Sequence, residues 1–516
     1  MKRINNFFDE TTKCIFASSV VLMILAHGFC FMNIMYSHDS LYFAYKGLGK
    51  IKLGRWLYPF LVQRRSIATP WLMGMLSILY VSLAVVLTSK VLELNKMQGV
   101  CVGVLFSSNI ALTSLFCTYI FDADADCLGL LLACLAVYSF KSFPKIVNIV
   151  VSVISISLCL ALYQAYICVA IGLFILILII DAICSESWND ILKVFMRGVE
   201  ELVTILLGSI LYISLMNGAA RYYGIKLSTG YNGAGKLSSL KLSDVINDIP
   251  VAYEYFRDTF FNITEYNTIF IVRLNLLMIA LIVISVAYYL IVHKNFLGSL
   301  IIVVPCIFIL PLGLNAIRLV SFGTMHQLMI FAFCLIYFVP ILLVFHSPEA
   351  VLDNQVLMMG IKYTRKAVCA ITFAVIVCIG FNNIVYSNGA YTYKKLVYDN
   401  TALHAQTIWK DINSIDGYKD GKTQVVFMGD FSKSKVAYNG TVGNRYLHVL
   451  HGANNSAITY QGTANEFYSN ILGRGLNIAH NDVEIAKNTE YLDMPAYPSN
   501  GYCKMIGDKV VVKLQN

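Results

Sequence analysis

Long stretches without charge recur along the chain. Residues 15–36, which read IFASSVVLMILAHGFCFMNIMY, contain no Asp, Glu, Lys or Arg. A helix of about 20 apolar residues crosses the roughly 30 Å of a bilayer core, so this stretch is long enough to span a membrane. Eight further uncharged stretches follow, at residues 71–89, 97–121, 146–180, 202–220, 274–292, 295–317, 319–346 and 367–393. The pattern therefore predicts a polytopic, all-α membrane protein.

The stretch at residues 146–180 determines the number of predicted spans. A single helix of this length would extend about 52 Å at 1.5 Å per residue, which is too long for one pass. Its middle reads YQAY at residues 163–166, and such aromatic and polar side chains favour the membrane interface. We therefore predict two short helices that meet there. With the shorter stretch 127–140, this gives about eleven spans.

An odd number of spans places the two termini on opposite sides of the membrane. The positive-inside rule assigns short basic linkers to the cytoplasm. Six such linkers fall on one side of the predicted bundle, and their basic residues are Lys2, Arg3, Lys13, Lys90, Lys96, Lys141, Lys145, Lys193, Arg197, Lys294, Lys362, Arg365 and Lys366. We therefore predict a cytoplasmic N-terminus, external loops at residues 37–70, 121–126 and 221–273, and an external C-terminal region.

The loop at residues 37–70 is unusually basic for the external side. It contains Lys46, Lys50, Lys52, Arg55, Arg64 and Arg65. Either the orientation is reversed, or these charges serve a purpose such as binding an anionic lipid phosphate. The chain as a whole has a net charge of +9, but it carries no nucleic-acid-binding motif. The basic charge therefore indicates the lipid bilayer and phosphate groups as partners, and no nucleic acid.

The composition changes after the last uncharged stretch. Beyond residue 387 Gly, Asn, Asp and Lys become frequent, and QVVFM at 424–428 and VVVKL at 510–514 are typical of strands. We therefore predict a transmembrane domain over residues 1–400 and a small soluble α/β domain over residues 401–516.

The first candidate site lies at the outer end of the first span. Asp39 directly follows that span, where an acid is costly to place and indicates function. It can serve as a general base that takes a proton from an acceptor hydroxyl. Arg55 presents a guanidinium fork that suits a phosphate, and we assign Lys52 to the same phosphate and His38 and Trp56 to a sugar. The structural alternative is that Asp39 caps a short helix.

The second candidate site contains Asp122, Asp124 and Asp126. Acids this close raise at least one pKa and suit a cation or a positive substrate group. We predict catalytic roles for Asp122 and Asp124, and no cofactor other than a divalent cation that this pair can hold through oxygen ligands. The alternative is a solvated loop in which Asp126 caps a helix that begins at Cys127.

Two further groups lie at predicted outer membrane edges. Tyr163, Gln164 and Tyr166 combine aromatic rings with an amide, which suits a sugar ring, although an interfacial aromatic belt has the same composition. Arg318 lies near His326 and can contact a phosphate. Its alternative role is that of an interfacial residue whose charged end extends to water.

Together these segments resemble the Gtr-type O-antigen glucosyltransferases, the bacteriophage-encoded serotype-converting enzymes of enteric bacteria. The resemblance rests on the order and placement of HDSLYF (38–43), GRWLYP (54–59), FDADAD with the following helix (121–140), LYQAY (162–166) and NNIVYSNGAYTYKKLVYD (382–399). It covers roughly residues 30–400, and the region beyond residue 400 has no counterpart in it.

The resemblance implies a GT-C-like fold in the bacterial inner membrane, with the C-terminal domain in the periplasm. It implies undecaprenyl-phosphate glucose as the donor and a sugar of the lipid-linked O-antigen polysaccharide as the acceptor, so that transfer converts the serotype. Such enzymes typically use an acid in the first external loop, which matches Asp39. They often carry a second acid pair, which matches Asp122 and Asp124, and many act without a metal.

Two other functions fit the same topology. The first is a flippase or transporter of lipid-linked sugars. Such proteins often contain repeated halves and helices broken near mid-membrane, whereas the acids here lie at span ends. A polysaccharide polymerase shares the large external loops, and an acceptor assay distinguishes it because a polymerase extends chains.

Overall fold

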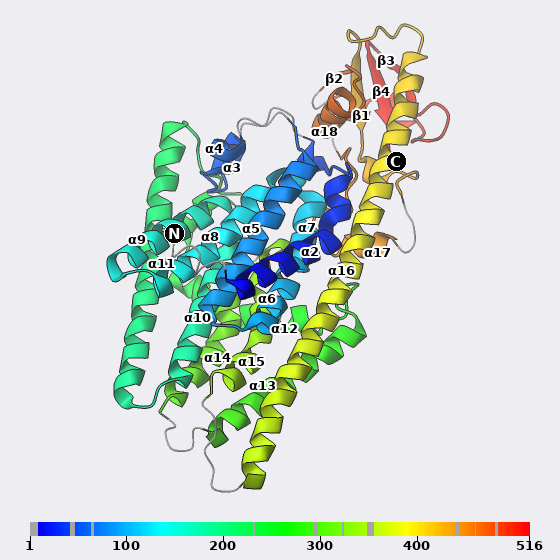
Figure 1. Cartoon of the computed structure of the whole chain (residues 1–516). Coiled ribbons are helices and arrows are strands. Elements are labelled where there is room, and N and C mark those ends of the chain that lie inside the picture. The colour runs from blue at the N-terminus through cyan, green and yellow to red at the C-terminus, as the bar shows by residue number, and fades with distance from the viewer. Residues whose placement is uncertain are drawn as a thin grey trace.

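The computed structural model describes residues 9–41, 47–62, 67–230, 233–292, 298–321, 325–347, 355–438, 443–459, 461–479 and 483–515. Six basic residues that the sequence analysis uses lie outside these ranges, namely Lys2, Arg3, Lys46, Arg64, Arg65 and Lys294. The described chain is a helical bundle with a small four-stranded sheet near its C-terminal end (Figure 1). This confirms the predicted all-α membrane fold with a small C-terminal α/β region.

The apolar helices of the bundle correspond to the uncharged stretches. Within the described residues, eight candidate spans are long and apolar enough to cross a membrane. Their helices are α2 (Glu10–Met32), α5 (Pro70–Val91), α6 with α7 (Lys96–Ser107, Ile110–Thr118), α9 (Lys145–Leu162), η3 with α10 (Gln164–Tyr166, Ile167–Ile183), α11 (Trp188–Tyr222), α13 (Ile269–Val292) and α16 (Gln355–Asn413). The other three predicted spans correspond to α8 (Ala123–Ser142), which carries charges in its first and last turns, and to the shorter helices α14 (Leu300–Leu314) and η7 with α15 (Phe331–Phe338, Val339–Phe345).

The predicted break within residues 146–180 is confirmed. Helix α9 ends at Leu162, and Tyr163 adopts an extended conformation with φ −147° and ψ 108°. The 3-10 turn η3 and helix α10 follow directly. The YQAY sequence therefore forms the connection between two separate helices.

The uncharged stretch 97–121 is also interrupted, which the sequence analysis does not predict. Helix α6 ends at Ser107, and Asn109 caps α7 by accepting a hydrogen bond from the backbone N–H of Ala111 at 3.0 Å. The Asn109 amide also donates to the carbonyl of Phe331 at 3.0 Å, although the whole side chain is buried. The turn η2 (Ile120–Asp122) follows α7 at the end of the bundle that carries the first loop, where Asp122 pairs with Lys50.

The connections at this end of the bundle form several short helices and one helix of 20 residues, and Figure 1 shows α3 and α4 there, toward the end that carries the sheet. They are η1 (His38–Ser40), α3 (Leu48–Ile51), α4 (Tyr58–Val62), η4 (Ala234–Ser239), α12 (Leu242–Phe261), η5 (Ala316–Val320) and η6 (Gln327–Met329).

Several of the basic linkers that the positive-inside rule groups together converge at the opposite end. Lys141 donates to the carbonyl of Val91 and pairs with Glu93, both at 2.7 Å. Lys145, at the start of α9, pairs with Glu200 at 3.1 Å. Because α9 ends beside η3, these basic linkers lie one helix length away from that turn.

Helix α16 connects the bundle to the C-terminal sheet (Figure 1). It has 59 residues, so the predicted domain boundary at residue 400 falls inside it. The strands are β1 (Gln424–Met428), β2 (Asn477–Ile478), β3 (Cys503–Ile506) and β4 (Lys509–Lys513), in the order β2-β1-β4-β3. Strand β1 is parallel to β2 and β4, and β3 is antiparallel to β4. Both predicted strands are confirmed, the second with a shift of one residue.

In the described part of the C-terminal region, short helices lie between the strands. They are η8 (Phe431–Lys433), α17 (Gly443–His448), α18 (Gln461–Glu466), η9 (Phe467–Ile471), η10 (Ile485–Lys487) and α19 (Thr489–Leu492). The Lys394 ammonium group of α16 donates to the carbonyls of Ala453 and Asn455, both at 2.8 Å. The segment between α17 and α18 is therefore held against the transmembrane part of the chain.

Candidate functional site

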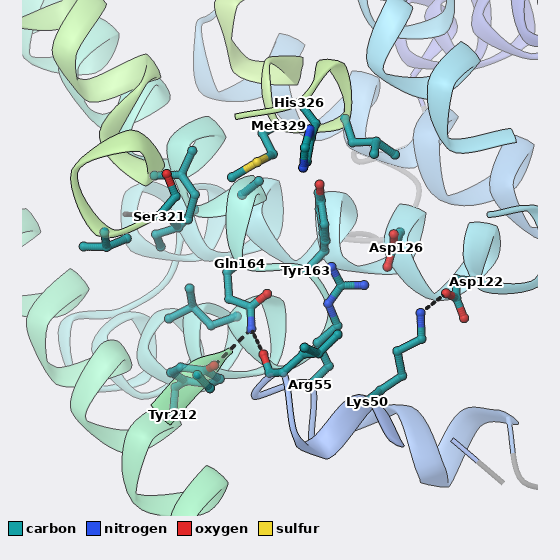
Figure 2. A pocket seen from close by; sticks show the side chains of 18 of the residues that line it. Lys50, Arg55, Asp122, Asp126, Tyr163, Gln164, Tyr212, Ser321, His326 and Met329 are labelled. Atoms are coloured by element: carbon teal, nitrogen blue, oxygen red, sulfur yellow. Dashed lines mark hydrogen bonds and ion pairs between the residues drawn. The ribbon is translucent and has the colours of Figure 1, made fainter. Parts of the chain in front are cut away.

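A cavity of about 650 Å³ lies among helix ends of the bundle, the first loop and the C-terminal region. Its charged lining consists of Asp39, Lys50, Arg55, Asp122 and Asp126. Its apolar lining includes Leu160, Ile167, Ile171, Ile205, Ile213, Ile317, Val320 and Leu328. In Figure 2 Lys50, Asp122 and Asp126 lie on one side and Tyr212 and Ser321 on the other. Tyr212 lies on α11 with Ile205 and Ile213, and Ser321 directly follows η5, which carries Ile317 and Val320. We call the part with Lys50, Asp122 and Asp126 the charged side and the part with these isoleucines and Val320 the apolar side, so the cavity is amphipathic.

Asp39 reaches the cavity from the short helix η1. The hydroxyls of Ser37 and Ser40, on either side of it, both donate to the carbonyl of Thr118 at the end of α7. The Asp39 carboxylate lies 3.4 Å from Nε2 of His38 and is the more exposed of the two side chains. Burial lowers the pKa of His38, although the Asp39 charge opposes that shift. The cap of η1 is Ser37, so Asp39 itself is not the helix cap.

Lys50 and Asp122 form an ion pair across the charged side (Figure 2). Lys50 comes from α3 in the first loop, and Asp122 ends η2. The Lys50 ammonium group also lies 5.5 Å from the centroid of the Tyr58 ring and 5.9 Å from that of Tyr119. Part of the basic charge of the first loop is therefore balanced by an acid of the next loop.

Arg55 stacks on the turn between α9 and α10. Its guanidinium carbon lies 4.7 Å from the centroid of the Tyr163 ring. Burial opposes the charge, but the Asp126 carboxylate and the neighbouring tyrosines raise the pKa of Arg55 above its ordinary value. Its Nε is buried without a hydrogen-bond partner among the described residues. Arg55 is thus a charged, oriented group with an unused donor.

Asp126 is a further acid of the cavity, and its structural context differs from the prediction. Helix α8 begins at Ala123, so Asp126 lies inside its first turn and does not cap a helix beginning at Cys127. Asp122, Asp124 and Asp126 are all buried, which contradicts a solvated loop. The Tyr58 hydroxyl donates to Asp126. Burial and the Asp126 charge raise the pKa of Tyr58, so the phenol keeps its proton.

Helix geometry explains why only two of the three acids reach the cavity. Residues four apart lie on the same face of a helix, whereas residues two apart do not. Asp122 and Asp126 line the cavity, and Asp124, predicted to be catalytic, is buried elsewhere.

Gln164 fixes the position of the first loop. Its amide nitrogen donates to the carbonyl of Leu53 at 2.8 Å and to the Tyr212 hydroxyl at 3.1 Å (Figure 2). Gly54 follows with a positive φ of 83°, and an added Cβ would collide with the Tyr212 hydroxyl. The first loop therefore approaches the bundle closely just before Arg55.

Five other predicted site residues do not line the cavity. Lys52 is exposed, and the ring of Tyr166 packs 5.6 Å from that of Phe331. One guanidinium nitrogen of Arg318 lies 3.8 Å from the Asp248 carboxylate. His38 and Trp56 also lie outside the lining, and each has a buried ring nitrogen without a hydrogen-bond partner among the described residues.

His326 and His451 line the cavity as well, and no sequence motif predicts a function for either. Their ring centroids are 3.7 Å apart with an interplanar angle of 21°. His326 precedes η6, whereas His451 comes from the C-terminal region, for which the sequence offers no motif. Among the residues that the structure describes, no group of three or more His, Cys, Asp and Glu side chains is arranged to hold a metal ion.

The fold and the cavity define a polytopic membrane protein with an amphipathic cavity that is lined by acidic and basic side chains. Residues 28–345 match the family described as glucosyl transferase GtrII. Because this match covers more than half of the chain and includes every predicted site residue, the chain belongs to that family and is a membrane glucosyltransferase of the Gtr type. This confirms the resemblance. No curated protein and no solved structure gives a significant match.

Proposed function

We propose that the chain transfers glucose from undecaprenyl-phosphate glucose to a sugar hydroxyl of lipid-linked O-antigen at the periplasmic face of the bacterial inner membrane, and so converts the serotype. The observation that carries this proposal is the amphipathic cavity. Its volume of about 650 Å³ falls within the range of small-molecule sites. A lipid-linked sugar phosphate has the same division into charged and apolar parts.

The charged side suits the sugar phosphate of such a donor. Lys50 and Arg55 supply the positive charge, and the buried Nε of Arg55 can donate to a phosphate oxygen. The apolar side lies between α9, α10, α11 and η5, where isoprenoid units can pack against Ile167, Ile205 and Ile317. The donor would therefore place its anomeric carbon near the charged side.

In the proposed transfer step Asp39, which lines the cavity, acts as the base. It takes a proton from the acceptor hydroxyl while that oxygen forms a bond to the anomeric carbon of glucose. The bond from this carbon to the phosphate oxygen breaks, and undecaprenyl phosphate leaves with the electron pair. Lys50 and Arg55 stabilise the charge that the leaving phosphate gains. No metal is required in this scheme.

The proposed orientation follows from the two ends of the bundle. The basic linkers at Lys141 and Lys145 lie away from the cavity, and the positive-inside rule makes that end cytoplasmic. The cavity and the C-terminal region then face the periplasm.

Mass analysis of surface polysaccharide from cells with and without the chain tests the proposal. We expect one additional hexose per repeating unit when the chain is present, and the same product from purified chain, undecaprenyl-phosphate glucose and polysaccharide of the deficient cells. A change in chain length without added glucose would indicate a polymerase. Altered transport without a new bond would indicate a flippase.

A further inference from the structure

The C-terminal region contributes one side chain to the cavity among the described residues, that of His451. This residue lies beyond residues 28–345, which match the glucosyltransferase family. Its ring stacks on that of His326, at 3.7 Å between centroids. In Figure 2 the hydroxyl of Tyr163 points toward His326. His451 thus adds a second imidazole ring to the cavity, beside that of His326.

A single residue, Thr118, connects His451 to Asp39. Its hydroxyl donates to the backbone carbonyl of His451 at 2.8 Å. Its own carbonyl accepts the hydroxyls of Ser37 and Ser40, which flank Asp39. Hydrogen bonds to Thr118, at the end of α7, therefore position both the segment of the proposed base Asp39 and that of His451.

Two further contacts restrict the segment that carries His451. The fully buried Lys394 donates to the carbonyls of Ala453 and Asn455, both at 2.8 Å. Gly452 has a positive φ of 71°, and a Cβ at this position would lie 3.0 Å from the Thr118 methyl group. A backbone held this tightly fixes the position of a side chain, as a binding site requires.

The protonation state of His326 and His451 indicates which of the two substrates, the donor phosphate or the acceptor sugar, these rings suit. Burial and the proximity of His451 lower the pKa of His326 to about 4. Burial also lowers the pKa of His451, although the Asp39 charge opposes it. At neutral pH both rings are uncharged, and each offers one N–H donor and one nitrogen acceptor. Neutral groups of this kind suit sugar hydroxyls better than a phosphate.

We propose that His451, supported by His326, contacts hydroxyls of the acceptor sugar and orients the reacting hydroxyl toward Asp39. The C-terminal region would then complete the acceptor side of the cavity, while Lys50 and Arg55 hold the donor. This inference rests on the proposed glucosyl transfer and adds a specificity-determining residue to it.

Transfer kinetics of the full-length chain in proteoliposomes test the inference. The probes are radiolabelled undecaprenyl-phosphate glucose and polysaccharide extracted from cells that lack the chain. We expect His451→Ala and His451→Phe each to raise the acceptor KM about tenfold, as loss of one hydrogen bond predicts, with an unchanged donor KM. The Thr118 hydrogen bond goes to the backbone, so both variants retain it. His448→Ala, at an exposed residue of the preceding helix α17, is the matched control.

The His451→Phe variant distinguishes a hydrogen bond to the acceptor sugar from mere packing of the His451 ring. Phe retains a ring that can stack on His326 but has no nitrogen. A wild-type acceptor KM in His451→Phe, or an equal rise in both KM values, would overturn the inference, because the ring would then serve only to pack the region. Absence of glucose transfer by the unchanged chain would overturn the proposed function and this inference with it.

Discussion

The guanidinium of Arg55 stacks on the ring of Tyr163, with 4.7 Å between the guanidinium carbon and the ring centroid. A cation over an aromatic face contributes about 0.5–2 kcal/mol, depending on its exposure to solvent. This contact joins the basic first loop to the turn that separates α9 from α10. The stack orients the planar fork of Arg55 along the charged side of the cavity, where Asp126 attracts it.

Arg55→Lys is expected to reduce glucose transfer at least about tenfold, because a lysine loses the planar fork, its stack and a charge-assisted hydrogen bond. Initial rates in membranes with matched protein amounts measure the effect. Lys52→Arg is the control, since Lys52 is exposed and does not line the cavity. A wild-type rate for Arg55→Lys would remove Arg55 from the phosphate contact.

The sequence predicts the bundle well because charge is excluded from lipid-facing helices. The uncharged stretches located the spans, and the YQAY sequence located the break between α9 and α10. The interruption at Asn109 was missed because it contains no charge and no proline. The buried Asn109 amide donates to the carbonyl of Phe331. Phe331 is distant in the sequence, so this contact has no local sequence signal.

The structure brings some of the predicted site residues together. Asp39, Arg55, Asp122, Tyr163 and Gln164 all line one cavity. The resemblance paired Asp122 with Asp124. Helix α8 begins at Ala123, however, and it places Asp126 in the cavity and Asp124 outside it. The position of His451 in the cavity depends on tertiary hydrogen bonds of Thr118 and Lys394, and no local sequence pattern predicts such contacts.

Gly54→Ala is expected to lower transfer activity and thermal stability. The αL conformation costs a residue with a side chain about 1–2 kcal/mol. In addition, the new Cβ would lie 3.1 Å from the Gln164 amide nitrogen and would collide with the Tyr212 hydroxyl, displacing Arg55. Gly49→Ala is the matched control, because a Cβ there meets nothing within 4 Å. Equal activity and melting temperature in the two variants would contradict this account of the loop.

Acidification is expected to destabilise the folded chain through His326. Its pKa is lowered from 6.5 to about 4, so between these values the folded state binds fewer protons at this residue than the unfolded state. Its contribution to stability therefore falls as the pH drops from 6.5 to 4, and it is constant above pH 6.5. Melting temperatures across this range should fall less steeply for His326→Phe than for the unchanged chain. Identical slopes would mean that His326 does not titrate in this window.

The C-terminus is expected to lie in the periplasm. Alkaline phosphatase fused after residue 516 should be active, and green fluorescent protein fused there should be dark. The structure already separates α9 from α10, so the opposite result would reverse the orientation of the whole bundle. It would also place the cavity at the cytoplasmic face and contradict a periplasmic acceptor.

Asp39→Asn is expected to abolish glucose transfer while leaving the chain folded and inserted. Asn has nearly the same shape and can keep neighbouring hydrogen bonds, but it cannot accept the proton of the acceptor hydroxyl. Removal of a general base typically costs about 10²–10⁴-fold in rate. Transfer rates at matched protein amounts provide the measurement, and melting temperature verifies the fold. Asp124→Asn is the control, since that acid is buried outside the cavity, and Asp122→Asn tests the remaining candidate. Full activity in Asp39→Asn together with an inactive Asp122→Asn would assign the base to the second loop.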